Sequence, residues 1–421
     1  MRIGLITNYY PPEVGSNSYL YQSLAHYLGA RGHKVFVITG QPRYHVPDGS
    51  AEPAAVTQEV CNVTVLRAKV LHILSGGIPA RVVNEAALPL AFLRQVRQAL
   101  PLDVICMYSP PLTLGLLGIA ARALWRVPFV FNVQDMLPQA AVDMGALRNP
   151  VLIAALRGIE RQIYRCAAAV LVHSEGNRQM IHRFHSTLRT RIQPVYNWVD
   201  FDQFDSLMPL PSQVAAFIEG KTVFSYGGAL GLQHDISTIL EAANRLRHKE
   251  DIVFVIAGDG VRRDQWSEMV RSRNLARVRV EPLMPQRQFN SLLLRSRASF
   301  LALSPMLKTP VVPGKLQTIM AAGVPALCVV NPESDAVQMV EKAGCGYCVK
   351  PGQVEELTRY IEVLAARPSE AEQMGARGRA FARKYFAKEN CMAAFEQELL
   401  LAAGRACGEG APALAAETEN A

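Results

Sequence analysis

The sequence contains no uninterrupted apolar run of about 18 residues, which is the length that a membrane-spanning helix requires. Aromatic residues make up only 7% of the chain, although half of its 421 residues are apolar. This composition predicts packed globular domains, and it excludes a disordered chain. A chain of this length is expected to form two domains of about 200 residues each.

Cysteine is scattered, and the eight residues include one close pair, Cys345 and Cys348, without a second CxxC. A structural zinc site usually has four ligands, so we expect no metal site. The first residues form a short apolar run that ends in a proline-containing turn, which is typical of a buried strand and not of a signal peptide. Unpaired thiols without a signal peptide indicate the reducing cytoplasm as the expected location.

Two common phosphate-binding motifs are missing. The first turn reads Asn-Tyr-Tyr-Pro-Pro-Glu-Val-Gly over residues 8–15 and not G-x-G-x-x-G, and no P-loop occurs. The second strand ends in Thr39-Gly40, without the acid that would hold a ribose hydroxyl. The dehydrogenase fingerprint is therefore excluded, and a phosphate ligand must be held in another way.

The excess positive charge lies in the first half of the chain. Residues 1–200 hold 19 Lys and Arg against 11 Asp and Glu, whereas residues 201–421 hold 25 of each. A basic surface attracts the phosphates of anionic lipids or of nucleic acid. The basic residues form no aromatic-interleaved cluster, so we expect no nucleic-acid partner and favour a lipid surface. The alternative is a basic surface that is merely solvated.

Short apolar strands alternate with helical stretches in both halves, which predicts two doubly wound α/β domains with parallel sheets. A loop near residues 200–211 separates the expected domains, residues 1–200 and 205–375, and the Ala- and Gly-rich tail from residue 404 is expected to be disordered. Ligands of such sheets bind beyond the carboxyl ends of the strands, so we expect a cleft between the two domains. The predicted strands are residues 2–7, 34–39, 63–69, 104–107, 129–133, 168–172, 222–226, 252–257, 278–280, 298–303 and 326–330.

Two turns of the first half are candidate sites. Gly15 permits a close backbone approach and Ser16 can cap the following helix, whose free N–H groups suit an anion. Gln134 and Asp135 follow the strand at residues 129–133 and should project at its carboxyl end. The alternatives are an ordinary capped turn in the first case and helix capping by Asp135 in the second.

The second half repeats one device, a strand followed by a glycine turn. The turns are Gly227-Gly228, with His234 just beyond, and Gly258-Asp259-Gly260. Glycine lets a nucleotide approach the backbone. The segment at residues 313–325 is the most specific, because Lys315 lies in the first turn of a predicted helix, where the helix dipole disfavours a cation. A bound anion would compensate for this charge, and the alternative is an exposed lysine without a function.

In this order, the motifs at residues 8–13, 132–138, 197–200, 258–260 and 312–325 resemble glycosyltransferase family 4. The match is closest to bacterial transferases of surface-polysaccharide assembly that transfer N-acetyl-L-fucosamine. The resemblance implies the GT-B fold, with an N-terminal acceptor domain, a C-terminal nucleotide-sugar domain and a final helix within residues 377–401 that crosses back. It also implies a UDP-linked donor and metal-independent transfer with retention at the anomeric carbon.

The resemblance also implies roles for individual residues. Lys315 would balance charge on the leaving diphosphate, and Asp135 and Gln134 would lie near the transferred sugar, so these three are the catalytic candidates. The donor-binding candidates are Gly15, Gly227, Gly228, His234, Gly258, Asp259, Gly260, Leu283, Met284, Pro313, Gly314, Leu316, Gln317 and Thr318. The acceptor-binding candidates are Tyr10, Pro11, Glu13, Ser16 and Asn197.

Three departures from the family pattern leave Lys315 as the only evident cation of the expected donor site. Pro310 and Thr318 stand where many relatives have two glutamates, residues 229–234 lack the usual Arg and Lys, and Gln134 stands where many have His. The competing interpretations are a UDP-sugar epimerase of the same fold and a non-catalytic subunit of a polysaccharide assembly complex.

Transferases of this kind commonly use a polyprenyl-diphosphate-linked sugar, which implies peripheral binding to the inner leaflet of the cytoplasmic membrane. Residues 78–100 and 112–125 have the character of in-plane amphipathic helices. The membrane candidates are Arg81, Phe92, Leu93, Arg94 and Arg97. The alternative is a pair of core helices.

Overall fold

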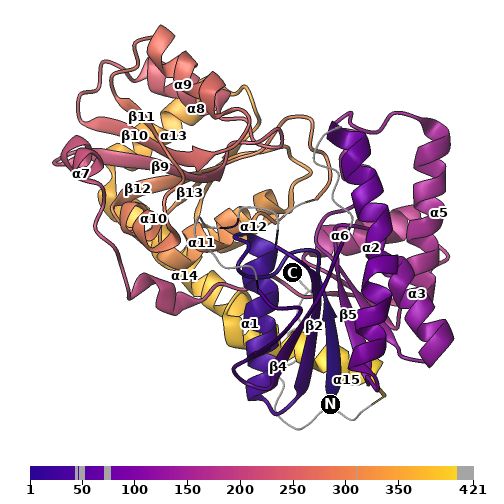
Figure 1. The fold of residues 1–421 in the computed structure, drawn as a ribbon. Helices are drawn as coiled ribbons and strands as arrows, with labels where there is room; N and C mark the ends of the chain where they lie inside the picture. The colour runs from indigo at the N-terminus through magenta and orange to yellow at the C-terminus, as the bar shows by residue number, and fades with distance from the viewer. Residues whose placement is uncertain (43–45, 47–52, 71–76, 311, 405–421) are drawn as a thin grey trace. The chain divides into compact units, whose positions relative to one another are not determined.

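The computed structural model describes residues 1–42, 46, 53–70, 77–310 and 312–404, drawn as ribbons in Figure 1. The chain divides into two compact units. Unit 1 comprises Met1–Gln139, Leu147–Tyr196 and Glu389–Ala421, and unit 2 comprises Ala140–Ala146 and Asn197–Lys388.

Unit 1 is built on an eight-stranded sheet with the order β3-β4-β2-β1-β5-β6-β7-β8. All neighbouring strands are parallel except β3 and β4, which pair antiparallel. The order reverses direction at β1, as in doubly wound folds, and ligand sites are common at such a point. The strands are β1 (Arg2–Ile6), β2 (Lys34–Gly40), β3 (Val56–Glu59), β4 (Val63–Ala68), β5 (Val104–Ser109), β6 (Phe129–Val133), β7 (Ala169–Val172) and β8 (Arg191–Pro194).

Helices cover both faces of this sheet, because each parallel connection must return across a face. Figure 1 shows α2, α3 and α5 side by side on the opposite side of the sheet from α1. The helices are α1 (Ser16–Ala30), α2 (Gly77–Ala99), α3 (Leu114–Trp125), α5 (Pro150–Cys166), α6 (Glu175–Phe184) and α15 (Lys388–Ala402), with α4 (Gln139–Asp143) at the division between the units.

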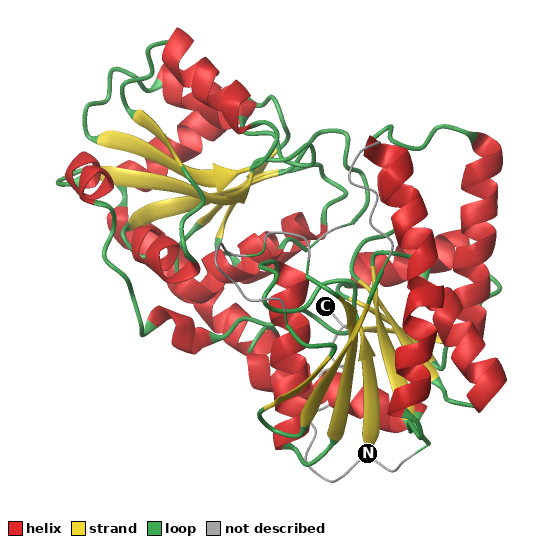
Figure 2. Ribbon diagram, viewed as in Figure 1, coloured by secondary structure: helices red, strands yellow, loops and turns green. Residues whose placement is uncertain are grey.

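Unit 2 has a six-stranded, fully parallel sheet with the order β11-β10-β9-β12-β13-β14, coloured yellow in Figure 2. Its strands are β9 (Thr222–Ala229), β10 (Ile252–Asp259), β11 (Val278–Glu281), β12 (Ser296–Ala302), β13 (Ala326–Val329) and β14 (Gly346–Val349). Its helical elements are η1 (Phe201–Phe204), α7 (Ser212–Ile218), α8 (Ser237–Arg245), α9 (Arg263–Ser272), α10 (Gln286–Leu293), α11 (Gly314–Ala322), α12 (Asp335–Ala343), α13 (Val354–Ala366) and α14 (Pro368–Tyr385).

The predicted two-domain α/β architecture is confirmed, and each predicted strand coincides with an observed one within three residues at either end. Three strands, β3, β8 and β14, were not predicted. Each has only four residues and lies at a sheet edge, and β3 and β8 also contain polar residues that interrupt the apolar run.

The C-terminal segment of the chain returns to unit 1. Helix α14 belongs to unit 2, where it packs against α11, and the part assigned to unit 1 begins at Glu389, inside the range of residues 377–401. In unit 1, Glu396 of α15 accepts hydrogen bonds from Tyr27 of α1 and from Arg31, which follows this helix, and it lies 2.8 Å from His33. The hydrogen bonds of the buried Glu396 therefore hold α15 against the C-terminal end of α1.

Candidate active site

The two glycine turns of unit 2 lie against each other at the carboxyl ends of β9 and β10. The strands pair in register up to Ala229 and Asp259, and the Leu230 amide donates to the Asp259 carbonyl. A Cβ atom on Gly258 would overlap the Gly228 carbonyl, and one on Gly260 would overlap the backbone of Leu230. These two glycines allow the turns to approach each other. The sequence had indicated only a close approach of a nucleotide to the backbone.

The first turn is also shaped by side chains of its own unit. A Cβ atom on Gly227 would overlap the ring of Phe289, and one on Gly228 would lie 2.5 Å from Lys315 Cε. Gly228 has φ +115°, a conformation that side chains rarely adopt. In this structure protein side chains lie beside both glycines, and both glycines remain partly exposed.

Lys315 lies in the first turn of α11 and reaches the end of β9. Its Nζ donates to the Tyr226 hydroxyl at 2.7 Å and to the Ala229 carbonyl at 3.4 Å. Pro313 occupies the N-cap position of α11, and no side chain caps this helix. A cation, uncapped helical N–H groups and the positive end of a helix dipole therefore come together, which suits an anion such as a diphosphate.

Burial controls the protonation of the two basic groups at this site. It lowers the pKa of Lys315 to about 7. Burial, with a smaller contribution from the charge of Lys315, lowers the pKa of His234 to about 3, so His234 is neutral at neutral pH. The buried Nδ1 of His234 has no hydrogen-bond partner among the described residues. His234 is therefore a neutral side chain with one unused polar atom beside the lysine.

The remaining donor candidates differ in what they can contact. Leu316 and Met284 are buried, so only their backbone atoms can reach a ligand, whereas Leu283 is exposed. Gln317 is buried and its side chain donates to the Asn197 carbonyl at 3.1 Å, so the side chain is used inside unit 2. Thr318 Oγ1 donates to the Gly314 carbonyl within the helix. The side chain of Asp259 accepts a hydrogen bond from the Gly260 amide and stays exposed.

In unit 1, the first turn is stiffened by buried polar contacts. Tyr10 is fully buried, and its hydroxyl donates to Glu59 at 2.9 Å. Glu13 is also buried and accepts from the Tyr10 amide, while Arg67 donates to the carbonyl of Pro11. Both side chains are used inside the unit, and the contact of Tyr10 and Glu13 with an acceptor stays a prediction.

The start of α1 differs in detail from the prediction. Gly15, and not Ser16, is the N-cap residue, and no side chain caps the helix. Ser16 is the first helical residue and is exposed. The capping role predicted for Ser16 is therefore wrong, and both residues stay available at an uncapped helix start.

Gln134 and Asp135 follow β6 at the carboxyl edge of the sheet, as predicted from the end of the strand. The Gln134 amide donates to the Ser109 carbonyl, and its side chain donates to Asn132 Oδ1 at 3.0 Å. Asp135 is exposed, and its charge adds to the burial that raises the pKa of Tyr108. The turn thus presents an exposed carboxylate beside an amide that is held in place.

Two buried residues at these strand ends were missed. His173 directly follows β7, its Nδ1 lies 3.5 Å from the Val133 carbonyl, and burial lowers its pKa to about 4. Tyr226 of β9 contacts Lys315. Their position in the sequence could have indicated them, because His173 and Tyr226 each lie near the end of an otherwise apolar parallel strand.

The predicted membrane segment forms α2, which packs on the sheet. Phe92 is fully buried in the unit 1 core and Leu93 is partly buried against it, so Phe92 is excluded as a membrane contact. Arg94 and Arg97 are exposed, and the side chain of Arg81 lies outside the described residues. In the part of the chain that the structure describes, no helix has the length and apolarity needed to cross a membrane.

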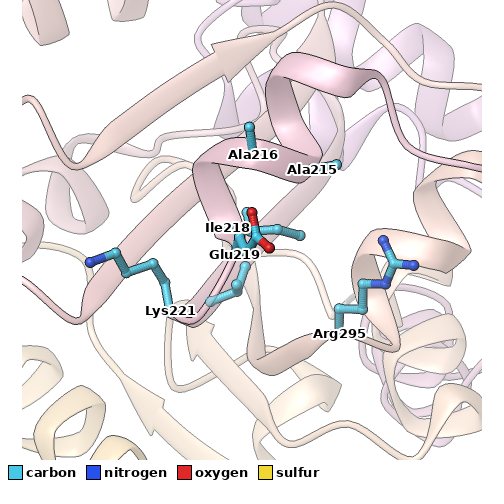
Figure 3. A pocket seen from close by; sticks show the side chains of 7 residues that line it. Ala215, Ala216, Ile218, Glu219, Lys221 and Arg295 are labelled. Atoms are coloured by element: carbon cyan, nitrogen blue, oxygen red, sulfur yellow. The ribbon is translucent and has the colours of Figure 1, made fainter.

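A cavity of about 500 Å³ in unit 2 lies away from the glycine turns. Figure 3 shows Lys221, which precedes β9, and Arg295, which precedes β12, among its lining residues. It therefore lies at the amino ends of these strands, whereas ligands of parallel sheets bind at the carboxyl ends. Within the described residues, no three His, Cys, Asp or Glu side chains gather as a metal site would require.

Comparison with known families identifies both units. Residues 15–198 match the Glycosyl transferase 4-like domain, and residues 212–381 match the Glycosyl transferases group 1 domain. The chain belongs to the GT-B glycosyltransferases. The two matches together span most of the chain and leave the division between the units at the loop after β8.

Relatives of this glycosyltransferase agree with the assignment. A protein named as a glycosyltransferase, WbjE of Pseudomonas aeruginosa, is 25% identical over 62% of this chain and 66% of its own length. A protein named as a colanic acid biosynthesis glycosyl transferase, WcaI of Escherichia coli K12, is 25% identical over 48% of this chain and 46% of its own length. The aligned regions thus span less than two thirds of either relative.

The fold has solved counterparts. The crystal structure of Anabaena Alr3699/HepE in complex with UDP superposes with a TM-score of 0.69 at 15% identity, over 95% of this chain and 99% of that chain. At this identity the likeness establishes the GT-B fold and leaves the substrates open.

Proposed function

We propose that the chain transfers a sugar from a UDP-sugar to a polyprenyl-diphosphate-linked sugar in bacterial surface-polysaccharide synthesis. The transferred sugar is N-acetyl-L-fucosamine or a similar amino sugar, and transfer proceeds with retention and without a metal ion. The name of WcaI, a colanic acid biosynthesis glycosyl transferase, supports the polysaccharide context, the name of WbjE supports sugar transfer, and the UDP-bound HepE supports the nucleotide. The sugar, the acceptor and the retention rest on the resemblance of the motifs.

The observation that carries this proposal is the position of Lys315 at the uncapped start of α11, beside the end of β9. Transfer breaks the bond between the anomeric carbon and a β-phosphate oxygen, and negative charge develops on the departing diphosphate. Lys315 and the first N–H groups of α11 stabilise that charge, the task that a metal ion performs elsewhere. The resemblance of the motifs assigns Asp135 and Gln134, which follow β6, to the transferred sugar.

Mass spectrometry of products tests the proposed reaction. Purified protein in detergent is incubated with polyprenyl-diphosphate N-acetylglucosamine, EDTA and a panel of UDP-sugars that includes UDP-N-acetyl-L-fucosamine. We expect a lipid-linked disaccharide with one donor. Conversion of the donor without a lipid product would favour an epimerase, and a folded protein that binds no donor would favour a non-catalytic subunit.

We expect the affinity for UDP to fall as the pH rises above about 7, because burial lowers the pKa of Lys315 to about 7. Below this pH, the ammonium is present with or without UDP and adds no pH dependence. Above it, the free protein has lost the proton and binding must take one up, so the affinity falls by up to about tenfold per pH unit.

Titration calorimetry above about pH 7 measures this dependence, since the terminal phosphate of UDP, with a pKa of about 6, is already ionised there. Lys315→Ala is the control, and its weaker binding should not vary with pH in this range. An equal slope in the wild type and in this variant would contradict the assignment of the proton to Lys315.

Peripheral membrane binding would use the outward face of α2 and not its buried face. Leu90 is 79% exposed, and Val83, Arg94 and Arg97 are exposed on the same helix. We expect Leu90→Glu combined with Arg94→Glu to weaken sedimentation with anionic vesicles at low salt, because each basic residue contributes about 1 kcal/mol near such a surface. Leu207→Glu, at an exposed apolar position of unit 2, is the control. If sedimentation with the vesicles were unchanged, α2 would not contribute to membrane binding and would serve only as a core helix.

A further inference from the structure

Tyr226 is a buried residue of β9 with an unusual set of contacts at the candidate donor site. Its hydroxyl donates to the Ala229 carbonyl at 2.8 Å and accepts from Lys315 Nζ at 2.7 Å. The same Nζ lies 4.5 Å from the centre of the Tyr226 ring. One side chain thus offers the ammonium both a hydrogen-bond acceptor and the negative face of an aromatic ring.

Gly228 completes this arrangement from the neighbouring turn. The Cε atom of Lys315 passes 2.5 Å from the place that a Cβ atom of residue 228 would occupy. Any side chain at this position would displace the lysine stem, because backbone atoms fix the turn on its other side. The lysine therefore runs through a gap that exists only because residue 228 is glycine.

We propose that Tyr226 is a positioning residue, which together with Gly228 forms a neutral seat that aims the Lys315 ammonium at the diphosphate of the donor. This proposal rests on the proposed function and adds two residues with a defined task. Gly228 then acts by admitting the lysine and not by admitting the nucleotide. Tyr226 acts through Lys315 and does not touch the reacting atoms.

The seat provides no negative charge. Among the described residues, Lys315 forms hydrogen bonds to Tyr226 and Ala229 and no ion pair. The other titratable group that faces it is His234, from the loop after β9, which is neutral at neutral pH. An ammonium held by dipoles alone keeps its attraction for an incoming anion, whereas a carboxylate partner would have to be displaced first. Because the seat is neutral, the ammonium of Lys315 can bind the diphosphate without first breaking an ion pair.

A double-mutant cycle tests the proposal. Tyr226→Phe removes the hydroxyl and keeps the ring, and it is combined with Lys315→Ala. We expect Tyr226→Phe to weaken UDP binding and to lower kcat/KM for transfer by about tenfold in the wild-type background, because a hydrogen bond to a charged group is lost. In the Lys315→Ala background, the same change should have almost no effect, since the group that Tyr226 positions is gone. Equal losses in both backgrounds would overturn the proposal.

A second measurement needs no substrate. NMR of protein labelled with ¹³C at lysine Cε follows the titration of Lys315 in the ligand-free protein, and the Lys315→Ala spectrum assigns its signal. The midpoint should move to lower pH in Tyr226→Phe, because the charged form loses an acceptor. An unchanged midpoint would overturn the positioning role, even if the protein proved not to be a transferase.

Tyr360→Phe is the matched control, because its hydroxyl hydrogen-bonds Glu356 within α13. This variant should leave UDP binding, transfer and the Lys315 titration unchanged. A failure of the proposed function appears differently, as absent UDP binding and transfer in the wild-type protein with the Lys315 titration still sensitive to Tyr226.

Discussion

Lys315→Ala is expected to lower turnover by about ten- to a thousandfold, as the removal of one group that stabilises developing charge does in other enzymes. The usual Arg and Lys of the first glycine turn are absent from residues 229–234, so at the start of α11 the variant would keep the helical N–H groups and no cation. The effect should fall mainly on kcat, because charge on the leaving group is greatest in the transition state. Steady-state rates with saturating donor measure it.

Lys221→Ala is the matched control for this loss. Lys221 is an exposed lysine of the same unit, at the amino end of β9 and beside the cavity of Figure 3. Its removal changes the net charge equally and should leave turnover unaltered. If Lys315→Ala folds normally and keeps full turnover, the leaving-group role is wrong, and the helix start alone must neutralise the diphosphate.

Gly375→Ala is expected to destabilise unit 2 by about 3 kcal/mol and to weaken UDP binding at the same time. A Cβ atom on Gly375 of α14 would overlap the carbonyl of Gly323, which ends α11 in the left-handed conformation. Backbone cannot yield as a flexible side chain does, so α14 must move away from α11. Because α11 carries Lys315 at its other end, that movement reaches the site. Urea unfolding and titration calorimetry with UDP measure the two effects.

Gly158→Ala is the control for the helical glycine. Gly158 lies within α5, and a Cβ atom there would meet nothing within 4 Å. The change should stabilise the protein by about 0.5–1 kcal/mol, because alanine favours a helix over glycine. If Gly375→Ala were equally harmless, close packing of α14 against α11 would not hold the donor site in place.

The absence of the usual paired glutamates is consistent with the structure of the donor site. Thr318 hydrogen-bonds its own helix, and Lys315 extends back to Tyr226 and Ala229, so the start of α11 contributes one cation and its N–H groups. The cation at the start of α11 is therefore a single side chain, whose pKa burial lowers to about 7. Because Tyr226 contacts Lys315 and Gly375 packs against α11, which carries Lys315, substitutions at all three positions are expected to weaken donor binding.

The sequence by itself determined the two α/β domains, nearly all of the central strands and the turns that follow them. Buried parallel strands leave a strong local signal, since each is a short apolar run ended by glycine or polar residues. The turns at Gly227, Gly258 and Gln134 were found for this reason, and Lys315 was found because a cation at a helix start is locally unfavourable.

Only the tertiary structure decided what surrounds those turns. Tyr226 looks like an ordinary core residue in the sequence, and its contact with Lys315 joins positions 89 residues apart. The buried side chains of Tyr10 and Gln317 likewise have partners distant in sequence, Glu59 and Asn197. Periodicity reports which face of an element is apolar, but the partner of a polar side chain is set by packing between elements. The roles of Gly228, Gly258 and Gly260 therefore follow from tertiary contacts that the sequence does not show.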